Sequence, residues 1–195
     1  MLFKEIINII FKRMPSLSIE EVELYSSFKA DVFVETGTYQ GDTINNVKNQ
    51  FKSVYSIELD KNYANMAVHR FRDDKNVYIV EGNSSVVLEP LCNSITEPAF
   101  FWLDGHWSGG DTARGDKDCP LIEELRVIVK NLKSKCIIAI DDVRLFGTKI
   151  NEDWSGITID NVLSEVKGRL ESYKFFPSYL NPSDRMVLVL NELVI

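Results

Sequence analysis

Five short apolar segments of this 195-residue chain are each followed by polar side chains that could bind a ligand. These side chains are Glu35, Glu58, Asn83–Ser85, Asp104 with His106, and Asp141–Asp142. Carboxylates accept hydrogen bonds from hydroxyls and attract cations, whereas they repel a diphosphate. The pattern therefore favours a ligand that carries hydroxyls or a positive charge.

The first of these positions opens a glycine turn, Glu-Thr-Gly-Thr-Tyr-Gln-Gly at residues 35–41. Gly37 and Gly41 permit a tight backbone and close approach of a ligand. The spacing is not Gly-x-Gly-x-x-Gly, and no Gly-Lys-Ser/Thr phosphate loop occurs in the chain. A dinucleotide or triphosphate cradle is thus disfavoured, and an amino-acid-bearing cationic ligand is favoured.

Glu58 and the residues after the next apolar segment suit a nucleoside. In nucleotide-binding sheets of parallel strands, an acid at the end of the second strand accepts hydrogen bonds from ribose hydroxyls. Asn83, Ser84 and Ser85 could bond an adenine edge, or could cap the helix that follows. For Glu58 the alternative is a solvated carboxylate beside Asp60.

Asp104, Asp141 and Asp142 could hold a metal ion. Three carboxylates at adjacent strand ends would repel by roughly 1–4 kcal/mol per pair at 4 Å, and a hard cation such as Mg²⁺ relieves that repulsion. Alternatively, Asp141 caps its loop and Asp142 is solvated. His106, one of two histidines, could be a base, a stacking group or a structural residue.

The elements that position these residues alternate between helical patterns and apolar strands. The pattern predicts helices at 18–28, 41–51, 61–72, 84–92, 120–132 and 157–170, and strands at 31–35, 53–58, 76–80, 99–103, 136–140, 173–176 and 185–190. Continuous apolar strands between helices indicate a parallel sheet covered on both faces. We therefore predict a Rossmann-like three-layer α/β/α sandwich with a mostly parallel seven-stranded sheet, whose ligand lies at the carboxyl ends of the strands.

The composition of the chain excludes several classes of protein. With 22 basic and 29 acidic side chains, the net charge of −7 argues against broad nucleic-acid binding. Three cysteines without a Cys-x-x-Cys pair indicate neither a zinc module nor a disulfide framework, and fit a reducing cytoplasm. Residues 1–13 predict an amphipathic helix too short to span a bilayer. We expect an N-terminal helical accessory at 1–30, which could form a homodimer contact, and one domain at 31–195.

Taken together, these motifs resemble those of the class I S-adenosylmethionine-dependent methyltransferases. The combination of Glu-x-Gly-x-Tyr-x-Gly, a following acid and Gly-x-Ser is similar to small-molecule O-methyltransferases of the catechol O-methyltransferase type. The stretch Asp-Gly-His-Trp at 104–107 looks like that group's Asp-His-Trp with one inserted glycine. Asp141–Asp142 stands where the group carries an Asp-Asn metal pair. The resemblance implies an antiparallel strand near 185–190 inserted beside the fifth.

The resemblance also implies roles for single residues. By this resemblance, the methionine moiety would be held by Glu35, Gly37, Tyr39 and Gly41, and the ribose by Glu58. Ser84 and Ser85 would lie on the adenine side, and His106 or Trp107 would cover the adenine ring. Thr38, Asn83 and Asp104 are further expected cofactor contacts. Asp104, Asp141 and Asp142 would hold Mg²⁺. Related enzymes place a lysine base after the tryptophan, where this chain has Ser108-Gly109-Gly110, so either His106 is the base or the metal alone acidifies the acceptor.

The expected function is metal-assisted O-methylation of a small hydroxylated acceptor such as a sugar, a sugar nucleotide or a polyphenol. Asp104 and His106 are the expected catalytic residues, and Arg114 could clamp a phosphate or carboxylate of the acceptor. Two alternatives stay open. One is a non-catalytic nucleotide- or metabolite-binding protein, and the other is a dinucleotide oxidoreductase, which the missing third glycine disfavours.

Overall fold

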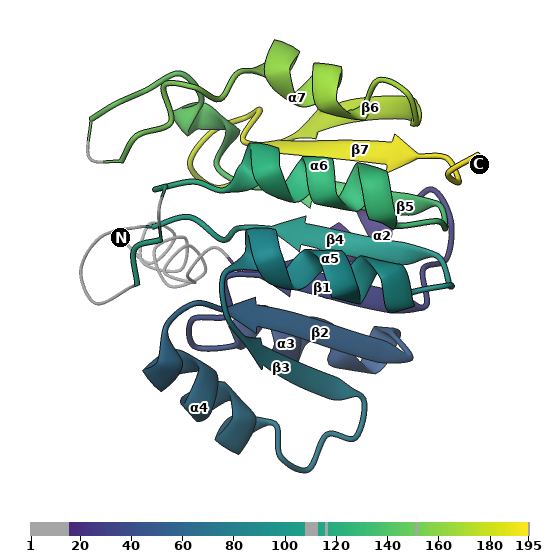
Figure 1. Ribbon diagram of the computed structural model, residues 1–195, viewed down its shortest axis with the longest axis vertical. Helices are drawn as coiled ribbons and strands as arrows, with labels where there is room; N and C mark the ends of the chain where they lie inside the picture. The colour runs from purple at the N-terminus through teal and green to yellow at the C-terminus, as the bar shows by residue number, and fades with distance from the viewer. Residues whose placement is uncertain (1–15, 108–112, 116, 151, 195) are drawn as a thin grey trace, which may run out of the picture.

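The computed structural model describes residues 16–107, 113–115, 117–150 and 152–194 (Figure 1). Its strands form one seven-stranded sheet in the order β3-β2-β1-β4-β5-β7-β6. They are β1 (Val32–Thr36), β2 (Ser53–Glu58), β3 (Val77–Glu81), β4 (Ala99–Leu103), β5 (Cys136–Ile140), β6 (Leu170–Phe176) and β7 (Arg185–Leu190). The described α-helices are α2 (Ile19–Tyr25), α3 (Asp42–Val47), α4 (Lys61–Arg70), α5 (Ser84–Ser94), α6 (Leu121–Asn131) and α7 (Ile159–Val166).

The pairing of the strands confirms the predicted topology. Strands β1 to β5 pair in parallel, and β7 is antiparallel to both β5 and β6. In register, Thr36 lies opposite Leu103, which in turn lies opposite Ile140. The residues that follow these three positions therefore gather at one edge of the sheet. This edge includes the point where the strand order reverses between β1 and β4, which is where open α/β sheets bind ligands.

Two apolar clusters cover the two faces of the sheet. One contains Leu88, Leu125 and Val162 from α5, α6 and α7, and the other contains Ile44 and Ala67 from α3 and α4. Every residue of β4 and β5 is buried, as expected for strands with helices on both faces. The helices of each layer are seen in Figure 1.

Local signals account for where several elements begin and end. The capping box predicted at Ser18 is confirmed: its Oγ accepts a hydrogen bond from Glu21 N at 3.2 Å, and Glu21 Oε2 accepts one from Ser18 N at 2.9 Å. The helix predicted at 157–170 instead begins after the Thr158 cap and ends at Val166. Leu170 belongs to β6 because it pairs with Leu190, a long-range contact that local periodicity does not show.

The helix expected over residues 1–13, and a homodimer contact through it, lie outside the described residues. The accessory segment is represented by α2, whose Tyr25 ring packs on Phe176 of β6 at a centroid distance of 4.6 Å. Among the described helices, none has the length and apolar character needed to cross a membrane.

Candidate functional site

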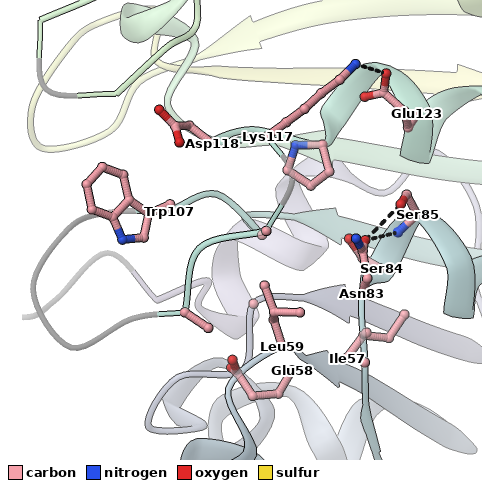
Figure 2. Close-up of a pocket in the computed structure, with 16 residues that line it drawn as sticks. Ile57, Glu58, Leu59, Asn83, Ser84, Ser85, Trp107, Lys117, Asp118 and Glu123 are labelled. Carbon is pink, nitrogen blue, oxygen red and sulfur yellow. Dashed lines mark hydrogen bonds and ion pairs between the residues drawn. The ribbon is translucent and has the colours of Figure 1, made fainter.

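A cavity of about 190 Å³ opens at the carboxyl ends of β1, β2 and β3 (Figure 2). Its walls come from the ends of these strands, from the loop after β4 and from the start of α6. The lining residues are Gly37, Ile57, Glu58, Leu59, Gly82, Asn83, Ser84, Ser85, Gly105, Trp107, Ala113, Gly115, Lys117, Asp118, Pro120 and Glu123. The structure thus brings the predicted residues Gly37, Glu58, Asn83, Ser84 and Ser85 to one cavity.

The carboxylate of Glu58 is held in place by two backbone amides. Tyr39 N donates to Oε2 and Asp60 N donates to Oε1, each at 2.8 Å. The turn that presents the first amide places Tyr39 at a φ of 47°, in the left-handed region. Each carboxylate oxygen keeps a further lone pair. Glu58 can therefore accept additional hydrogen bonds from a ligand without losing its own support.

The turn after β3 combines a helix cap with the cavity wall. Asn83 Oδ1 accepts hydrogen bonds from Ser85 N at 3.0 Å and from Ser85 Oγ at 2.8 Å, so the capping interpretation is correct for Asn83. The three residues Asn83, Ser84 and Ser85 also line the cavity, where Figure 2 shows them opposite Trp107. Capping and ligand contact are thus compatible in this turn.

Glu35 belongs to strand β1, just before the glycine turn, and is only 1% exposed. Its Oε2 has no hydrogen-bond partner among the described residues. Burial raises the pKa of this carboxyl well above its ordinary value, and the nearby Asp104 raises it further. The ionised form of such a buried carboxyl would be stabilised by a cationic partner.

The two glycines of the turn are required by different neighbours. Gly37 has a φ of +86°, and a Cβ there would lie 2.7 Å from the backbone oxygen of Asp104. Gly41 has a φ of +78°, and a Cβ there would lie 2.7 Å from the ring of Phe71. Both positions need glycine for packing within the protein, and of the two only Gly37 lines the cavity. Thr38 Oγ1 lies 2.5 Å from Ser56 Oγ, so this side chain is engaged with β2 rather than with the cavity.

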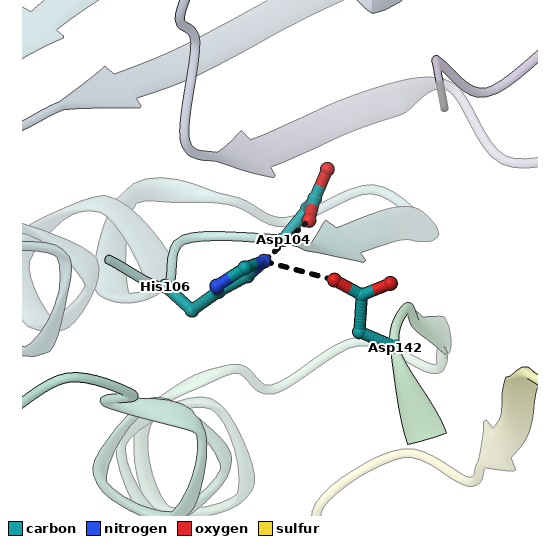
Figure 3. A group of neighbouring side chains, drawn as sticks. All are labelled: Asp104, His106 and Asp142. Atoms are coloured by element: carbon teal, nitrogen blue, oxygen red, sulfur yellow. Dashed lines mark ion pairs between the residues drawn. The ribbon is translucent and has the colours of Figure 1, made fainter. Parts of the chain in front are cut away.

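Beside the cavity, His106 lies among three carboxylates, of which Figure 3 shows Asp104 and Asp142. Its Nε2 is 2.9 Å from Asp142 Oδ2 and 3.7 Å from Asp104 Oδ1, and its Nδ1 is 2.9 Å from Glu152 Oε2. Burial lowers the pKa of His106, but the contacts with Asp142 and Glu152 outweigh this and raise it to about 11. The ring is outside the lining of the cavity, and Trp107 is the aromatic residue that lines it.

Asp141 points to a different partner from Asp142. Arg185 Nε donates to Asp141 Oδ1 at 3.2 Å, and the guanidinium of Arg185 also contacts Glu21 of α2. The same guanidinium lies over the ring of Trp102 at 5.0 Å. Two groups of possible metal ligands, each with atoms within 4.8 Å of one another, occur among the described residues: Asp104–His106–Asp142 and Asp141–Asp142–Asp184.

Two acidic residues of this region were missed by the sequence analysis. Glu152 contacts His106 from a loop without periodic pattern, so no local signal was present. Glu124 did have one, because it falls on the buried stripe of α6 with Leu121, Leu125 and Ile128. Burial raises the pKa of Glu124 to about 7, against the opposing effect of the nearby hydroxyls of Ser84 and Thr36.

Arg114 contacts other protein groups next to the cavity. Its guanidinium donates to Asp118 Oδ1 at 2.6 Å and to Oδ2 at 3.1 Å, and it stacks over the Trp107 ring at 4.5 Å. Trp107 N in turn donates to Asp118 O at 2.7 Å. The arginine expected to clamp an acceptor thus braces the aromatic wall of the cavity.

No family model and no curated protein matches the sequence. Solved structures do: a candidate methyltransferase from Streptococcus mutans in complex with SAH is 16% identical, with a TM-score of 0.57 over 92% of this chain and 100% of that chain. An rRNA methylase from Streptococcus thermophilus is 16% identical, with a TM-score of 0.53 over 93% and 100% of the two chains.

A spermidine synthase from Thermotoga maritima is 11% identical, with a TM-score of 0.51 over 83% of this chain and 53% of that chain. These likenesses show that the chain has the Rossmann-like fold of class I S-adenosylmethionine-dependent methyltransferases. At such identities, the reaction has to be argued from the site itself.

Proposed function

We propose that the protein is an S-adenosylmethionine-dependent methyltransferase whose methyl donor lies in the cavity beside Glu58. The observation that carries this proposal is the supported carboxylate of Glu58, at the end of β2, with free lone pairs in a cavity between a glycine turn and a polar helix cap. This arrangement suits the two hydroxyls of a ribose. The methyltransferases among the structural neighbours support the same choice.

Further residues are compatible with the rest of this ligand. The buried Oε2 of Glu35, which has no hydrogen-bond partner among the described residues, suits the ammonium group of the methionine moiety. Trp107, braced by Arg114, offers a flat apolar surface to an adenine ring, and Ser84 and Ser85 offer hydroxyls to its edge. When bound, S-adenosylmethionine supplies an electrophilic methyl group. The protein's contribution is to hold donor and acceptor in line, which is worth about 7–11 kcal/mol at best.

For the acceptor we propose a small hydroxylated molecule, methylated on oxygen with the help of a divalent cation. The expected Mg²⁺ ligands were Asp104, Asp141 and Asp142. The side chains of Asp104 and Asp142 face the same imidazole nitrogen and are close enough together to hold a divalent cation. Asp141 instead faces Arg185, and Asp142 contacts Arg144 through its other oxygen. A cation held there would lower the pKa of an acceptor hydroxyl.

Calorimetry tests the donor assignment directly. We expect S-adenosylhomocysteine to bind the purified protein and NAD⁺ not to bind. Tight binding of NAD⁺ without binding of S-adenosylhomocysteine would overturn the proposal in favour of an oxidoreductase.

Transfer of a labelled methyl group to a panel of sugars, sugar nucleotides and polyphenols, with and without chelator, then tests the reaction. We expect label in at least one acceptor, with the chelator reducing the rate. Binding of the donor without transfer to any member of a broad panel would favour a non-catalytic binding protein.

A further inference from the structure

The side chains of Asp104, His106 and Asp142 are spaced as ligands of one ion. With metal–ligand distances of about 2.0–2.2 Å, neighbouring ligand atoms lie about 2.8–3.1 Å apart around an octahedral ion and about 3.3–3.6 Å apart around a tetrahedral one. His106 Nε2 is 2.9 Å from Asp142 Oδ2, within the first interval, and 3.7 Å from Asp104 Oδ1, just beyond the second. The ligand atoms of all three residues lie within 4.8 Å of one another. Only small side-chain adjustments are needed to bring the three groups onto a common ion.

The other nitrogen of the imidazole is oriented by a carboxylate outside this group. His106 Nδ1 lies 2.9 Å from Glu152 Oε2, and the same oxygen accepts a hydrogen bond from Trp154 Nε1 at 2.8 Å. The Trp154 ring packs edge-on against the imidazole at 5.0 Å and is 3% exposed. In protein metal sites, a ligating histidine almost always donates its second N–H to such a partner. Glu152 therefore aims Nε2 at the two aspartates.

The neighbouring carboxylates have arginine partners, and Asp104 does not. Asp141 contacts Arg185, and Asp184 accepts from Arg144 at 2.7 Å. The same Arg144 also contacts Asp142 through Oδ1, which leaves Oδ2 of Asp142 facing His106. Among the described residues, the ion pair of Asp104 is with His106 alone, at 3.7 Å. Asp104 thus has no arginine or lysine partner among the described residues, and it faces an imidazole whose orientation is already set.

We propose that Asp104, His106 and Asp142 form a mixed imidazole–carboxylate metal site, with Glu152 as the residue that positions His106, and that this site takes a first-row transition-metal ion in preference to Mg²⁺. This metal-site proposal rests on the proposed function, because it names the ligands and the class of cation for the same acceptor site. Imidazole suits Zn²⁺, Fe²⁺ and similar ions, whereas Mg²⁺ favours oxygen ligands alone. His106 then serves as a ligand, with the ion displacing the proton of Nε2 to solvent, and Asp141 is replaced in that role.

The two histidines of the chain make a direct spectroscopic test feasible. In ¹⁵N-labelled protein freed of metal by chelation and dialysis, imidazole nitrogen resonances are recorded during titration with Zn²⁺, without donor or acceptor. We expect Nε2 of His106 to shift on binding and the resonances of His69, exposed on α4, to stay in place. Unchanged His106 resonances at saturating Zn²⁺ would overturn the proposal.

Affinity measurements on variants complete the test. His106→Gln should weaken Mn²⁺ and Zn²⁺ by at least tenfold and Glu152→Gln by about 10–100-fold, while the control His69→Gln should bind like the wild type. The proposed metal site would be contradicted if His106→Gln bound Mn²⁺ and Zn²⁺ as tightly as the wild type does. It would also be contradicted if the wild type bound Mg²⁺ more tightly than Mn²⁺ and Zn²⁺.

Circular dichroism checks that the variants fold. If a variant does not fold, the Zn²⁺ titration of the wild-type imidazole resonances alone decides whether His106 binds the metal. Calorimetry with S-adenosylhomocysteine on the same samples separates the two proposals, because loss of donor binding with an intact metal site affects the proposed function alone.

Discussion

Two groups of carboxylates share Asp142 but differ in what neutralises them. The arginine-paired cluster, Asp141, Asp142 and Asp184, is contacted by Arg185 and Arg144. The open cluster, Asp104, His106 and Asp142, has only the imidazole as a cationic partner for Asp104 among the described residues. Proximity of acids alone therefore does not distinguish a ligand site from a structural network; the fixed cations around them do.

The arginine-paired cluster also connects distant parts of the chain. Arg185, at the start of β7, joins Asp141 after β5 to Glu21 and Tyr25 of α2. Its side chain is almost fully buried. This cluster therefore ties the N-terminal segment to the sheet, while the open cluster adjoins Gly105 and Trp107 of the cavity wall.

Removing Arg185 should have the largest effect. Arg185→Met leaves Asp141 buried without its partner, and breaking a buried ion pair from one side costs about 3–5 kcal/mol. Urea unfolding followed by circular dichroism measures the loss. The matched control is Arg126→Met, because Arg126 pairs with Glu165 at the surface and should cost at most about 1 kcal/mol. Equal losses in the two variants would contradict a structural role for the arginine-paired cluster.

Glu124, a buried acid with no arginine partner among the described residues, should make stability depend on pH. The folded-state pKa of Glu124 is raised to about 7, so the folded protein binds more protons than the unfolded chain between about pH 4.5 and 7. Its contribution is fully present below pH 4.5 and is lost as the pH rises through 7, amounting to about 3 kcal/mol. Glu124→Gln should flatten the profile of unfolding free energy over this range. Parallel profiles for the variant and the wild type would refute the shift.

Donor binding should depend on Glu58. Glu58→Ala removes the acceptor of the ribose hydroxyls and should weaken S-adenosylhomocysteine by about 1.5–3 kcal/mol, the range for hydrogen bonds to a charged group. Isothermal calorimetry measures the change. Glu81, at the matching position of β3 and exposed, provides the control, and Glu81→Ala should bind like the wild type. Unaltered affinity in Glu58→Ala would remove Glu58 from the site.

The smallest effect on stability is expected in the open cluster. Burial raises the pKa of Asp104 well above its ordinary value, and the charge of Asp141 adds to it, so ionised Asp104 disfavours the folded state near neutral pH. Asp104→Asn removes that charge and should leave the unfolding free energy in urea unchanged or raised. Burial also raises the pKa of Asp141, to about 6, but Arg185 opposes that rise. Asp141→Asn should lower the unfolding free energy, because the buried Arg185 loses its charged partner. Losses of similar size in both variants would erase the difference between the clusters.

The fold could be predicted from the sequence because the patterns that indicate its strands and helices are local. Continuous apolar runs predicted β2, β4 and β5 with their observed bounds, and the capping box predicted the start of α2. The same runs placed Glu58, Asp104 and Asp141 at one edge, since parallel strands end on the same side of a sheet.

The side chains that contact these residues could not be predicted from the sequence. Arg185 lies far along the chain from Asp141, and Glu152 reaches His106 from an irregular loop, so their contacts depend on tertiary packing. Glu124 could have been found, because a carboxylate on the apolar stripe of α6 is recognisable before the structure is known.

The central claim, that the cavity beside Glu58 holds S-adenosylmethionine, is tested most directly by a crystal structure of the protein with S-adenosylhomocysteine. We predict ribose hydroxyls within hydrogen-bonding distance of Glu58, the adenine ring against Trp107 and the methionine ammonium on the side of Glu35. An adenosine bound elsewhere, or a Glu58 carboxylate with no contact to the ribose, would contradict the account.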